Sequence, residues 1–362
     1  MKTHEYDILV IGAGPAGSSA AYAASDKGWD VLMIEQKPII GVPVRCAEYI
    51  PAPLMNEINI NRDFIVQHVK GMRTILPDGT ITESPAPGLM IRRDIFDQAL
   101  AKKAEEAGTR LRPCTRLISM DENGALVQSR AERYRIKARI IIGADGPHTT
   151  VGRLINSRNM DLIPAIQIIA DLTQRMDVTE VYFNKDLYGG YGWLFPKGYK
   201  ANIGIAMRKR DGISCPIKEC LQRFIARLRQ GSKIRGEVSG WTAGWIPIGR
   251  PRSLVHKNIM LAGDAAGQTH PISGAGVAQA VICGGMAGKW AGLALAADDT
   301  AILSGYDMEW RDLYGDSQEL AYSRRELMEK EWDSLDDIIK RCWIGFRDYY
   351  EERDSSMRSK EP

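Results

Sequence analysis

The sequence predicts an α/β protein in which a dinucleotide-binding domain is interrupted by an antiparallel β-sheet domain and followed by a helical C-terminal part. Three observations predict this arrangement: a strand, glycine turn, helix and strand pattern at residues 6–36, short aromatic and β-branched runs between residues 163 and 245, and a charged segment with helical patterning beyond residue 300. The 362 residues exceed a usual single domain, so two structural units with a large core are expected.

The first unit opens with YDILVIGAGPAGSSAAYAASDKGWDVLMIEQ. A buried strand from Asp7 to Ile11 leads through a glycine turn into an Ala-rich helix, and a second buried strand ends at Glu35. Within the turn, glycines recur at the GxGxxG spacing with a proline and an alanine between them: Gly12, Gly14, Pro15, Ala16 and Gly17. The order of these elements predicts a Rossmann-like βαβ unit.

Each part of this turn has a function in binding a dinucleotide. The first glycine allows the tight turn, the second lets the backbone approach a pyrophosphate, and the third packs the helix on the strand. Free N–H groups at the helix N-terminus bind the phosphates, and Glu35 is placed to accept hydrogen bonds from a ribose diol. The pattern indicates a dinucleotide but does not say which one.

The middle of the chain alternates between the two predicted units. The segment VKGMRTILPDGTITES predicts a hairpin that turns at residues 77–79. Asp94 is expected to N-cap a helix that ends at Gly108 and has these residues on one face: Ile95, Phe96, Ala99 and Leu100. A strand is predicted from about Arg110, then a hairpin at DENG, then the buried strand of ARIIIGADG.

Short β-branched and aromatic runs at residues 163–245 predict the antiparallel sheet of a substrate domain, after which NIMLAGDAAG and a helix from about Gly276 return to the first pattern. The nucleotide-binding domain is therefore expected at residues 1–68, 91–162 and 251–300, and the substrate domain at 69–90 and 163–250. Residues 301–362 are expected to be helical, with a frayed end at 355–362.

Composition limits the possible functions. The net charge of +3, without a basic tail, argues against a nucleic-acid partner. The N-terminus does not resemble a secretory signal, and no apolar run is long enough to span a membrane, so a cytoplasmic protein is expected. The six cysteines lack CxxC pairs and His-Cys metal spacing, which predicts free thiols and no metal site.

Two further glycine turns indicate which dinucleotide is bound. IIIGADG ends a strand at Asp145, and IMLAGDAAGQTHPISGAG ends another at Gly263 and Asp264 before a helix start at residues 274–276, which are Gly274, Ala275 and Gly276. Asp264 can accept a hydrogen bond from a ribityl hydroxyl, and the helix N-terminus can stabilise the negative charge of a reduced flavin. With Arg92 or Arg93 before the residue-94 helix, this set resembles the para-hydroxybenzoate hydroxylase class of FAD enzymes. The resemblance implies that Asp264 binds FAD and that the arginine lies along it.

Within that class, two segments resemble the geranylgeranyl reductase family. GVPVRCAEYI is similar to the family's PVxCGE loop, and YGGYGWLFPKG matches its YxWxFPK segment at Tyr191, Trp193, Phe195, Pro196 and Lys197. The resemblance covers residues 1 to about 300 and departs from the family pattern at Ala47 and Ala275, where the family has glycine. It implies that Arg45, Cys46 and Ala47 lie at the flavin.

The function of Cys46 has two readings. The resemblance places its thiol near flavin and substrate, where it can serve as a proton source or as a small polarizable wall. Unpaired cysteine is also among the most buried residue types, so Cys46 could be a packing residue. The neighbouring Arg45 and Glu48 are expected to pair or to line the entrance, or equally to be a solvated loop pair.

Three other features carry a functional and a packing interpretation. Tyr191, Trp193 and Phe195 alternate along one strand, so they share one face, either as an apolar wall for a hydrocarbon chain or as ordinary core. The amphipathic helix at residues 217–228 is expected to cover a sheet rather than contact a membrane. His270 is expected to shape the loop before Pro271 rather than to titrate in catalysis.

These features together predict an FAD-dependent reductase that delivers a hydride from flavin N5 to a carbon–carbon double bond of an isoprenoid chain. No second GxGxxG unit is present for a nicotinamide, so a reduced ferredoxin-like protein and transiently bound NADPH are both possible electron donors. A peripheral contact with the membrane is also expected. The alternatives are a flavin monooxygenase or halogenase, although Tyr191 replaces the first Trp of the halogenases' WxWxIP segment, and an electron-transfer flavoprotein that reduces a quinone or a partner protein.

Overall fold

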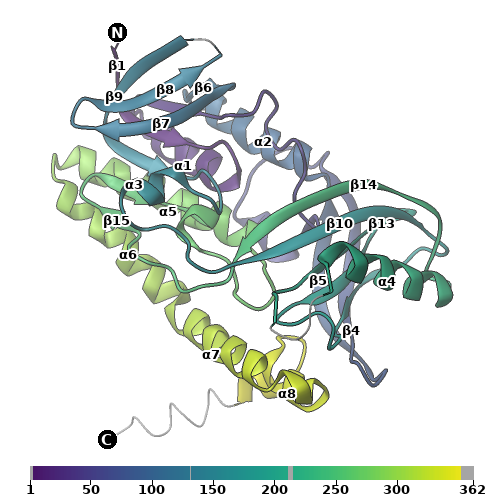
Figure 1. Ribbon diagram of the computed structural model, residues 1–362. Coiled ribbons are helices and arrows are strands. Elements are labelled where there is room, and N and C mark those ends of the chain that lie inside the picture. The colour runs from purple at the N-terminus through teal and green to yellow at the C-terminus, as the bar shows by residue number, and fades with distance from the viewer. Residues whose placement is uncertain (1–2, 131, 211–214, 352–362) are drawn as a thin grey trace, which may run out of the picture.

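The computed structural model describes residues 3–130, 132–210 and 215–351, and it contains two eight-stranded sheets with helices around them (Figure 1). The end at residues 355–362, predicted to be frayed, lies outside this range. The α/β fold class with an inserted sheet and a helical C-terminal part is confirmed.

The first sheet has a parallel centre with the order β16-β9-β1-β2-β6, and β15 and the hairpin β7-β8 extend it with antiparallel pairs. Its strands are β1 (Thr3–Ile11), β2 (Val31–Ile34), β6 (Arg110–Arg112), β7 (Thr115–Asp121), β8 (Gly124–Ser129), β9 (Glu132–Gly143), β15 (Val255–His256) and β16 (Ile259–Leu261). β1 begins four residues before the predicted start at Asp7, because residues 3–6 also pair with β9.

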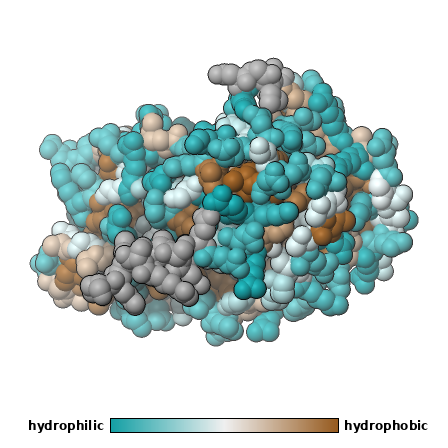
Figure 2. All heavy atoms as spheres, turned by 90° about the horizontal axis from the view of Figure 1, so that it is seen from below, coloured by the Kyte–Doolittle hydropathy of each residue, from teal (hydrophilic) through white to brown (hydrophobic). Residues whose placement is uncertain are grey.

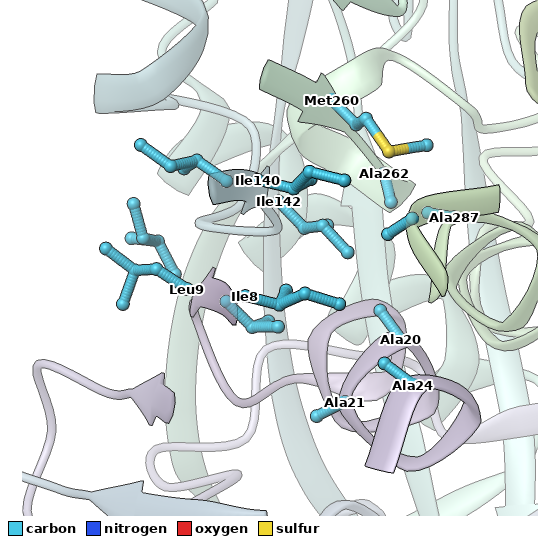
Figure 3. Close-up of a cluster of buried hydrophobic side chains, with 14 of the residues drawn as sticks. Ile8, Leu9, Ala20, Ala21, Ala24, Ile140, Ile142, Met260, Ala262 and Ala287 are labelled. Atoms are coloured by element: carbon cyan, nitrogen blue, oxygen red, sulfur yellow. The ribbon is translucent and has the colours of Figure 1, made fainter. Parts of the chain in front are cut away.

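Two helices, α1 (Pro15–Ser25) and α5 (Val277–Ala296), cover one face of this sheet. In Figure 3 the methyl groups of Ala20 and Ala24 point toward the side chains of the central strands. The two helices are in close contact at Gly284 and Gly288 of α5, where glycine leaves room for the backbone of α1. A Cβ at either position would lie 2.2 Å from a backbone carbonyl oxygen of α1. The N-terminus of α1 is thereby fixed against the centre of the sheet.

The second sheet has the order β14-β10-β13-β12-β11-β4-β5-β3. Its strands are β3 (Tyr49–Pro51), β4 (Ile65–Ile75), β5 (Ile81–Ile91), β10 (Leu162–Leu172), β11 (Val178–Tyr182), β12 (Tyr191–Lys197), β13 (Lys200–Ala206) and β14 (Ile234–Pro247). It is antiparallel except between β11 and β4, which run parallel.

Helix α4 (Ile217–Gln230) covers one face of the second sheet (Figure 1). Its predicted apolar face is buried against the sheet, which confirms that the helix belongs to the core: Cys220, Leu221, Phe224, Ile225 and Leu228.

The C-terminal part consists of α6 (Ser304–Trp310), a π-helical turn at Arg311–Gly315, α7 (Asp316–Lys330) and α8 (Leu335–Cys342). Short 3₁₀ turns occur at Ala52–Asn56, Gly263–Ala266, Thr300–Leu303 and Trp332–Ser334. Trp332 and Trp343 are fully buried in a cluster that also contains Phe183, the residue after β11. Seen from below, the surface is mainly hydrophilic, with apolar side chains gathered near its middle (Figure 2).

The start of helix α2 (Arg93–Glu106) differs from the prediction that Asp94 is its N-cap. Arg92 occupies the N-cap position, and its side chain makes no capping hydrogen bond. Instead the distant Glu48 carboxylate accepts a hydrogen bond of 2.9 Å from the backbone N–H of Arg93. This tertiary contact satisfies one of the free N–H groups that a local cap would have satisfied. The short helix α3 (Thr150–Leu154) completes the first unit.

Candidate active site

The glycine turn between β1 and α1 has the geometry that a dinucleotide requires. Gly12 has a φ of +102°, and a Cβ there would lie 2.3 Å from the Ala144 carbonyl oxygen. A Cβ on Gly17 would lie 1.8 Å from the Gly12 carbonyl oxygen, so both glycines are needed for close packing. At Gly14, by contrast, a Cβ would meet nothing within 4 Å. The open side of the turn therefore lies at the helix N-terminus, which carries a partial positive charge.

One pocket joins this turn to other predicted residues. Gly14 and Glu35 line it from the βαβ unit, Arg45 from the loop at residues 41–48, and Arg93 from the start of α2. The Glu35 carboxylate accepts hydrogen bonds from the Ala13 and Lys37 backbone N–H groups at 3.0 and 2.9 Å, which hold it at the pocket. Four residues predicted from three separate segments are thus brought together.

Arg93 lies at the centre of the acidic groups of this region. Its Nε is 2.6 Å from the Asp97 carboxylate, and both side chains are largely buried. Its guanidinium also interacts electrostatically with the thiol of Cys46 and with the carboxylate of Asp264. The positive charge of Arg93 therefore acts both on the loop that carries Cys46 and on the turn that follows β16.

Asp264 and the turns around it form a second cradle. Gly263 has a φ of +64°, and a Cβ on it would lie 2.8 Å from the Cβ of Ala16 at the start of α1. Burial raises the pKa of Asp264, and the Arg93 charge acts in the opposite direction. No side chain of the described residues donates a hydrogen bond to the Asp264 carboxylate. A Cβ on Gly276 would lie 3.3 Å from one of its oxygens, so the helix start also lies beside it.

The aromatic residues of β12 share one face, as predicted. Tyr191, Trp193 and Phe195 pack in one cluster together with Ala47 of the Cys46 loop. The Trp193 indole N–H donates to the Gln167 side-chain oxygen at 3.0 Å, and the Gln167 amide donates to the Cys46 carbonyl oxygen at 3.1 Å. The aromatic strand is thus joined to the loop that carries the thiol.

Comparison with known proteins identifies the family. A family model described as an FAD binding domain matches residues 5–181, and one described as a geranylgeranyl reductase catalytic domain matches residues 161–241. The digeranylgeranylglycerophospholipid reductase of Methanosarcina acetivorans is 35% identical over 95% of this chain and 86% of its own. The corresponding protein of Methanococcus aeolicus is 32% identical over 92% of this chain and 90% of its own. The chain belongs to the geranylgeranyl reductase family. It is accordingly an FAD-dependent oxidoreductase.

Solved structures agree with this assignment. A geranylgeranyl bacteriochlorophyll reductase-like protein from Thermoplasma acidophilum has a TM-score of 0.83 and 27% identity, and the match covers 98% of this chain and 100% of that one. A flavin-dependent brominase has a TM-score of 0.70 at 19% identity and covers 98% of this chain and 92% of its own. The second likeness shows a common fold and nothing about the reaction.

The residues of this geranylgeranyl reductase family member fit FAD on structural grounds. The free space beside Gly14 and the N-terminus of α1 are suited to a pyrophosphate. Glu35 lines the same pocket directly after β2, a position that suits hydrogen bonds to the ribose of an adenosine. The buried Asp264 carboxylate, which lies near Arg93, accepts no side-chain hydrogen bond from the described residues, and this suits a hydroxyl of the ribityl chain.

Two predictions about charged residues need correction or refinement. Arg45 and Glu48 do not pair: Arg45 is exposed, whereas Glu48 is buried and lies 2.6 Å from Lys197. The solvated loop pair is wrong for the same reason. Asp145, predicted to bind the cofactor, accepts hydrogen bonds from the Thr149 hydroxyl and the Thr150 backbone N–H at 2.5 and 2.6 Å. Its carboxylate is therefore engaged at the start of α3.

The structure also adds residues that sequence reasoning missed. Lys37, Gly41, Pro43 and Asp97 line the pocket beside the predicted residues. Gln167 connects the aromatic strand to the Cys46 loop. The four pocket residues each lie within six residues of a predicted site residue, so nearness in the sequence could have identified them. Gln167 belongs to no motif and has no predicted site residue near it in the sequence.

His270 shapes its loop, as predicted. Its Nδ1 accepts hydrogen bonds from the backbone N–H groups of Ile272 and Ser273 at 3.4 and 3.2 Å. Burial lowers the pKa of His270 to about 4, so the ring stays neutral near pH 7 and keeps Nδ1 as an acceptor. The Tyr191 hydroxyl donates to the Ser273 carbonyl oxygen, which ties this loop to β12.

All six cysteines are free, as predicted. Within the described ranges, no group of His, Cys, Asp or Glu side chains is arranged to hold a metal ion. No helix in the same ranges combines the length and the apolar character needed to cross a membrane.

Proposed function

We propose that this chain saturates carbon–carbon double bonds in geranylgeranyl-type isoprenoid chains carried on a membrane lipid. The observation that supports this most strongly is the direct connection between the flavin pocket and the aromatic strand, through Cys46, Gln167 and Trp193. An apolar wall beside a redox cofactor suits a hydrocarbon substrate. The names of the relatives point to the same substrate class.

FAD supplies the hydride when it is bound and reduced. The chain's own residues must then orient the alkene, exclude water and provide a proton for the second carbon, because an alkene has no carbonyl oxygen to stabilise charge. We propose that Tyr191, Trp193, Phe195 and Pro196 hold the chain and that the Cys46 thiol supplies the proton or holds the alkene in place.

The test of this proposal uses anaerobically reduced, FAD-loaded enzyme and a geranylgeranyl lipid. Cys46→Ala should slow reoxidation of the flavin by the lipid about tenfold or more while the flavin spectrum and the melting temperature change little. Cys46→Ser separates the two functions of the thiol, because a serine hydroxyl is much less acidic than a thiol and would fail as a proton donor but serve as a wall.

Mass spectrometry of the lipid product should show a gain of two hydrogens for each bond reduced. Normal reoxidation by both Cys46 variants would leave the thiol as a packing residue, and failure of the wild-type enzyme to be reoxidised by any prenyl lipid would refute the reductase proposal itself.

The electron donor and the cellular location also stay proposals. NADPH and a reduced ferredoxin-like protein are the two candidate donors, and anaerobic bleaching of the flavin by NADPH alone would select the first.

We propose a cytoplasmic enzyme that touches the membrane at its periphery. Trp241 and Trp245 on the edge strand β14 are 52% and 47% exposed, and such side chains favour the membrane interface. Co-sedimentation with lipid vesicles, lost in Trp241→Ala and Trp245→Ala, would support this contact.

A further inference from the structure

The loop that carries Cys46 is anchored to the second sheet by a buried ion pair. Glu48 follows Cys46 by two residues, and its side chain is only 5% exposed. Its Oε2 lies 2.6 Å from Nζ of Lys197, the last residue of β12. Asn202 on β13 donates to the same oxygen at 2.9 Å, and the Arg93 backbone N–H donates to Oε1 at 2.9 Å. Both oxygens are therefore held, by groups from three separate elements.

The ion pair reaches the sulfur of Cys46 through the backbone of Glu48. The Glu48 backbone N–H donates to the Cys46 Sγ at 3.2 Å. Glu48 has a φ of +67°, in the left-handed region that residues other than glycine seldom adopt, so its contacts must hold this conformation. The direction of the N–H that meets the sulfur thus depends on where the Glu48 carboxylate is fixed.

The residues between the thiol and the ion pair are held by the same sheet. The Cys46 carbonyl oxygen accepts from Gln167 of β10 at 3.1 Å, and the Ala47 carbonyl oxygen accepts from Asn202 of β13 at 3.0 Å. Earlier in the same loop, the Val44 carbonyl oxygen accepts a hydrogen bond of 2.9 Å from the Thr242 hydroxyl of β14. Among these contacts only the one to Lys197 pairs full charges, so it is the one whose loss leaves a buried charge without a partner.

We propose that Glu48 and Lys197 are positioning residues that set where the Cys46 thiol lies relative to the flavin pocket. This inference rests on the proposed function of Cys46 for its consequence in catalysis, but not for its structural content. Removing either charge forces water or a new contact into the loop. The Glu48 N–H then no longer holds Sγ, and the thiol becomes more accessible and less well placed.

The test measures the alkylation rate of Cys46 by iodoacetamide in the FAD-loaded full chain, with peptide mass spectrometry to identify the modified cysteine. Lys197→Met and Glu48→Gln should each accelerate alkylation of Cys46 about fivefold or more. The maximal rate of reoxidation by a geranylgeranyl lipid should fall about tenfold with little change in KM, because placement rather than binding is lost. Lys197→Arg, which keeps the charge, should restore most of both properties.

A second buried carboxylate, that of Glu180 on β11, gives a matched control. Glu180 of β11 is 1% exposed and lies 2.7 Å from Lys233, the residue before β14, and 3.1 Å from Arg73. Glu180→Gln, which removes a buried carboxylate charge as Glu48→Gln does, should lower the melting temperature yet leave Cys46 alkylation within about twofold of wild type. Equal acceleration in this control would overturn the proposal, since general destabilisation would then explain the effect.

Two further outcomes are informative. If Lys197→Met does not fold, the double variant Glu48→Gln/Lys197→Met removes both charges, leaves none unpaired, and should still accelerate alkylation. Cys46 alkylation within about twofold of wild type in every folded variant of the pair would overturn the proposal. Normal turnover by Cys46→Ala would refute the proposed role of the thiol in catalysis and leave the alkylation rates to decide the positioning, so the two failures are distinguishable.

Discussion

At the scale of single residues, Arg93 carries the positive charge beside two buried carboxyl groups, those of Asp97 and Asp264. Burial raises the pKa of Asp264, and the nearby Arg93 guanidinium limits that rise by favouring the charged carboxylate. Arg93 is in turn neutralised by Asp97, at 2.6 Å. Asp264 is therefore a buried carboxyl group with one positive charge beside it and no side-chain donor among the described residues.

Asp264→Ala should weaken FAD binding, because it removes a charge-assisted hydrogen bond worth about 1.5–3 kcal/mol, or roughly a tenfold to hundredfold rise in Kd. Asp264→Asn should lose less, since an amide oxygen can still accept. Quenching of FAD fluorescence during titration of the apoprotein measures both. Asp298→Ala, which changes an exposed carboxylate, is the control. Equal Kd values for wild type and Asp264→Ala would contradict the assignment.

His270 predicts a pH dependence of stability. Its folded-state pKa is about 4, whereas a histidine in an unfolded chain titrates near about 6.5, so below pH 6.5 the unfolded state takes up a proton that the folded state does not. The free energy of unfolding should fall by up to about 3 kcal/mol between pH 7 and pH 4 through this group. His270→Gln should flatten that part of the curve, as measured by urea denaturation at each pH. An unchanged slope would show that other groups cause the loss.

At the scale of elements, the contact between α1 and α5 fixes the N-terminus of α1, whose free N–H groups suit a pyrophosphate. Gly284 and Gly288 lie on the side of α5 that meets the Ala16 and Ala20 carbonyl oxygens, while Gly285 faces away, where a Cβ would have no neighbour within 4 Å. Small residues on both helices let the backbones approach, and the spacing of four places them on one face. The three glycines thus differ in surroundings although they lie in one helix.

Gly288→Ala should lower the free energy of unfolding by about 1–3 kcal/mol, because the added methyl group must separate two helices. Gly285→Ala should raise it by about 0.5–1 kcal/mol, because alanine costs less backbone entropy than glycine in a helix and meets no neighbour there. Thermal or urea unfolding of the two variants gives the comparison directly. The same sign for both would mean that α1 and α5 can move apart freely.

At the scale of the whole molecule, the sequence predicts features that depend on residues close together in the chain, and it does not predict contacts between distant segments. The βαβ unit, the antiparallel runs and the covering face of the residue 217–230 helix follow from periodicity and glycine spacing, which are properties of short stretches. The predicted cap at Asp94 and the pairing of Arg45 with Glu48 were wrong for one shared reason. The Glu48 carboxylate is used by Lys197 and the Arg93 N–H, groups 149 and 45 residues away in the chain.

The C-terminal helices show the same limit, because one of their buried arginines contacts two loops that are distant in the sequence. Arg325 of α7 is 6% exposed, and its two terminal nitrogens donate to the Pro271 carbonyl oxygen at 2.7 Å and to the Gly189 carbonyl oxygen at 2.8 Å. Glu329 balances its charge at 2.7 Å. Pro271 belongs to the loop before α5, and Gly189 precedes the aromatic strand, so a single side chain joins three parts of the molecule.

Arg325→Met should therefore lower the free energy of unfolding by about 3–5 kcal/mol, since it leaves Glu329 partly buried with less compensation and two carbonyl groups without donors. FAD should also dissociate faster, because the loop at Pro271 leads into the start of α5. Arg250→Met is the matched control: Arg250 pairs with Glu319 and Glu326 of the same helix, but it is 47% exposed and should contribute about 1 kcal/mol or less. Urea denaturation and the rate of FAD release report the two effects separately. If Arg325→Met destabilises the fold while FAD release stays at the wild-type rate, the helix supports the sheet without holding the flavin loop.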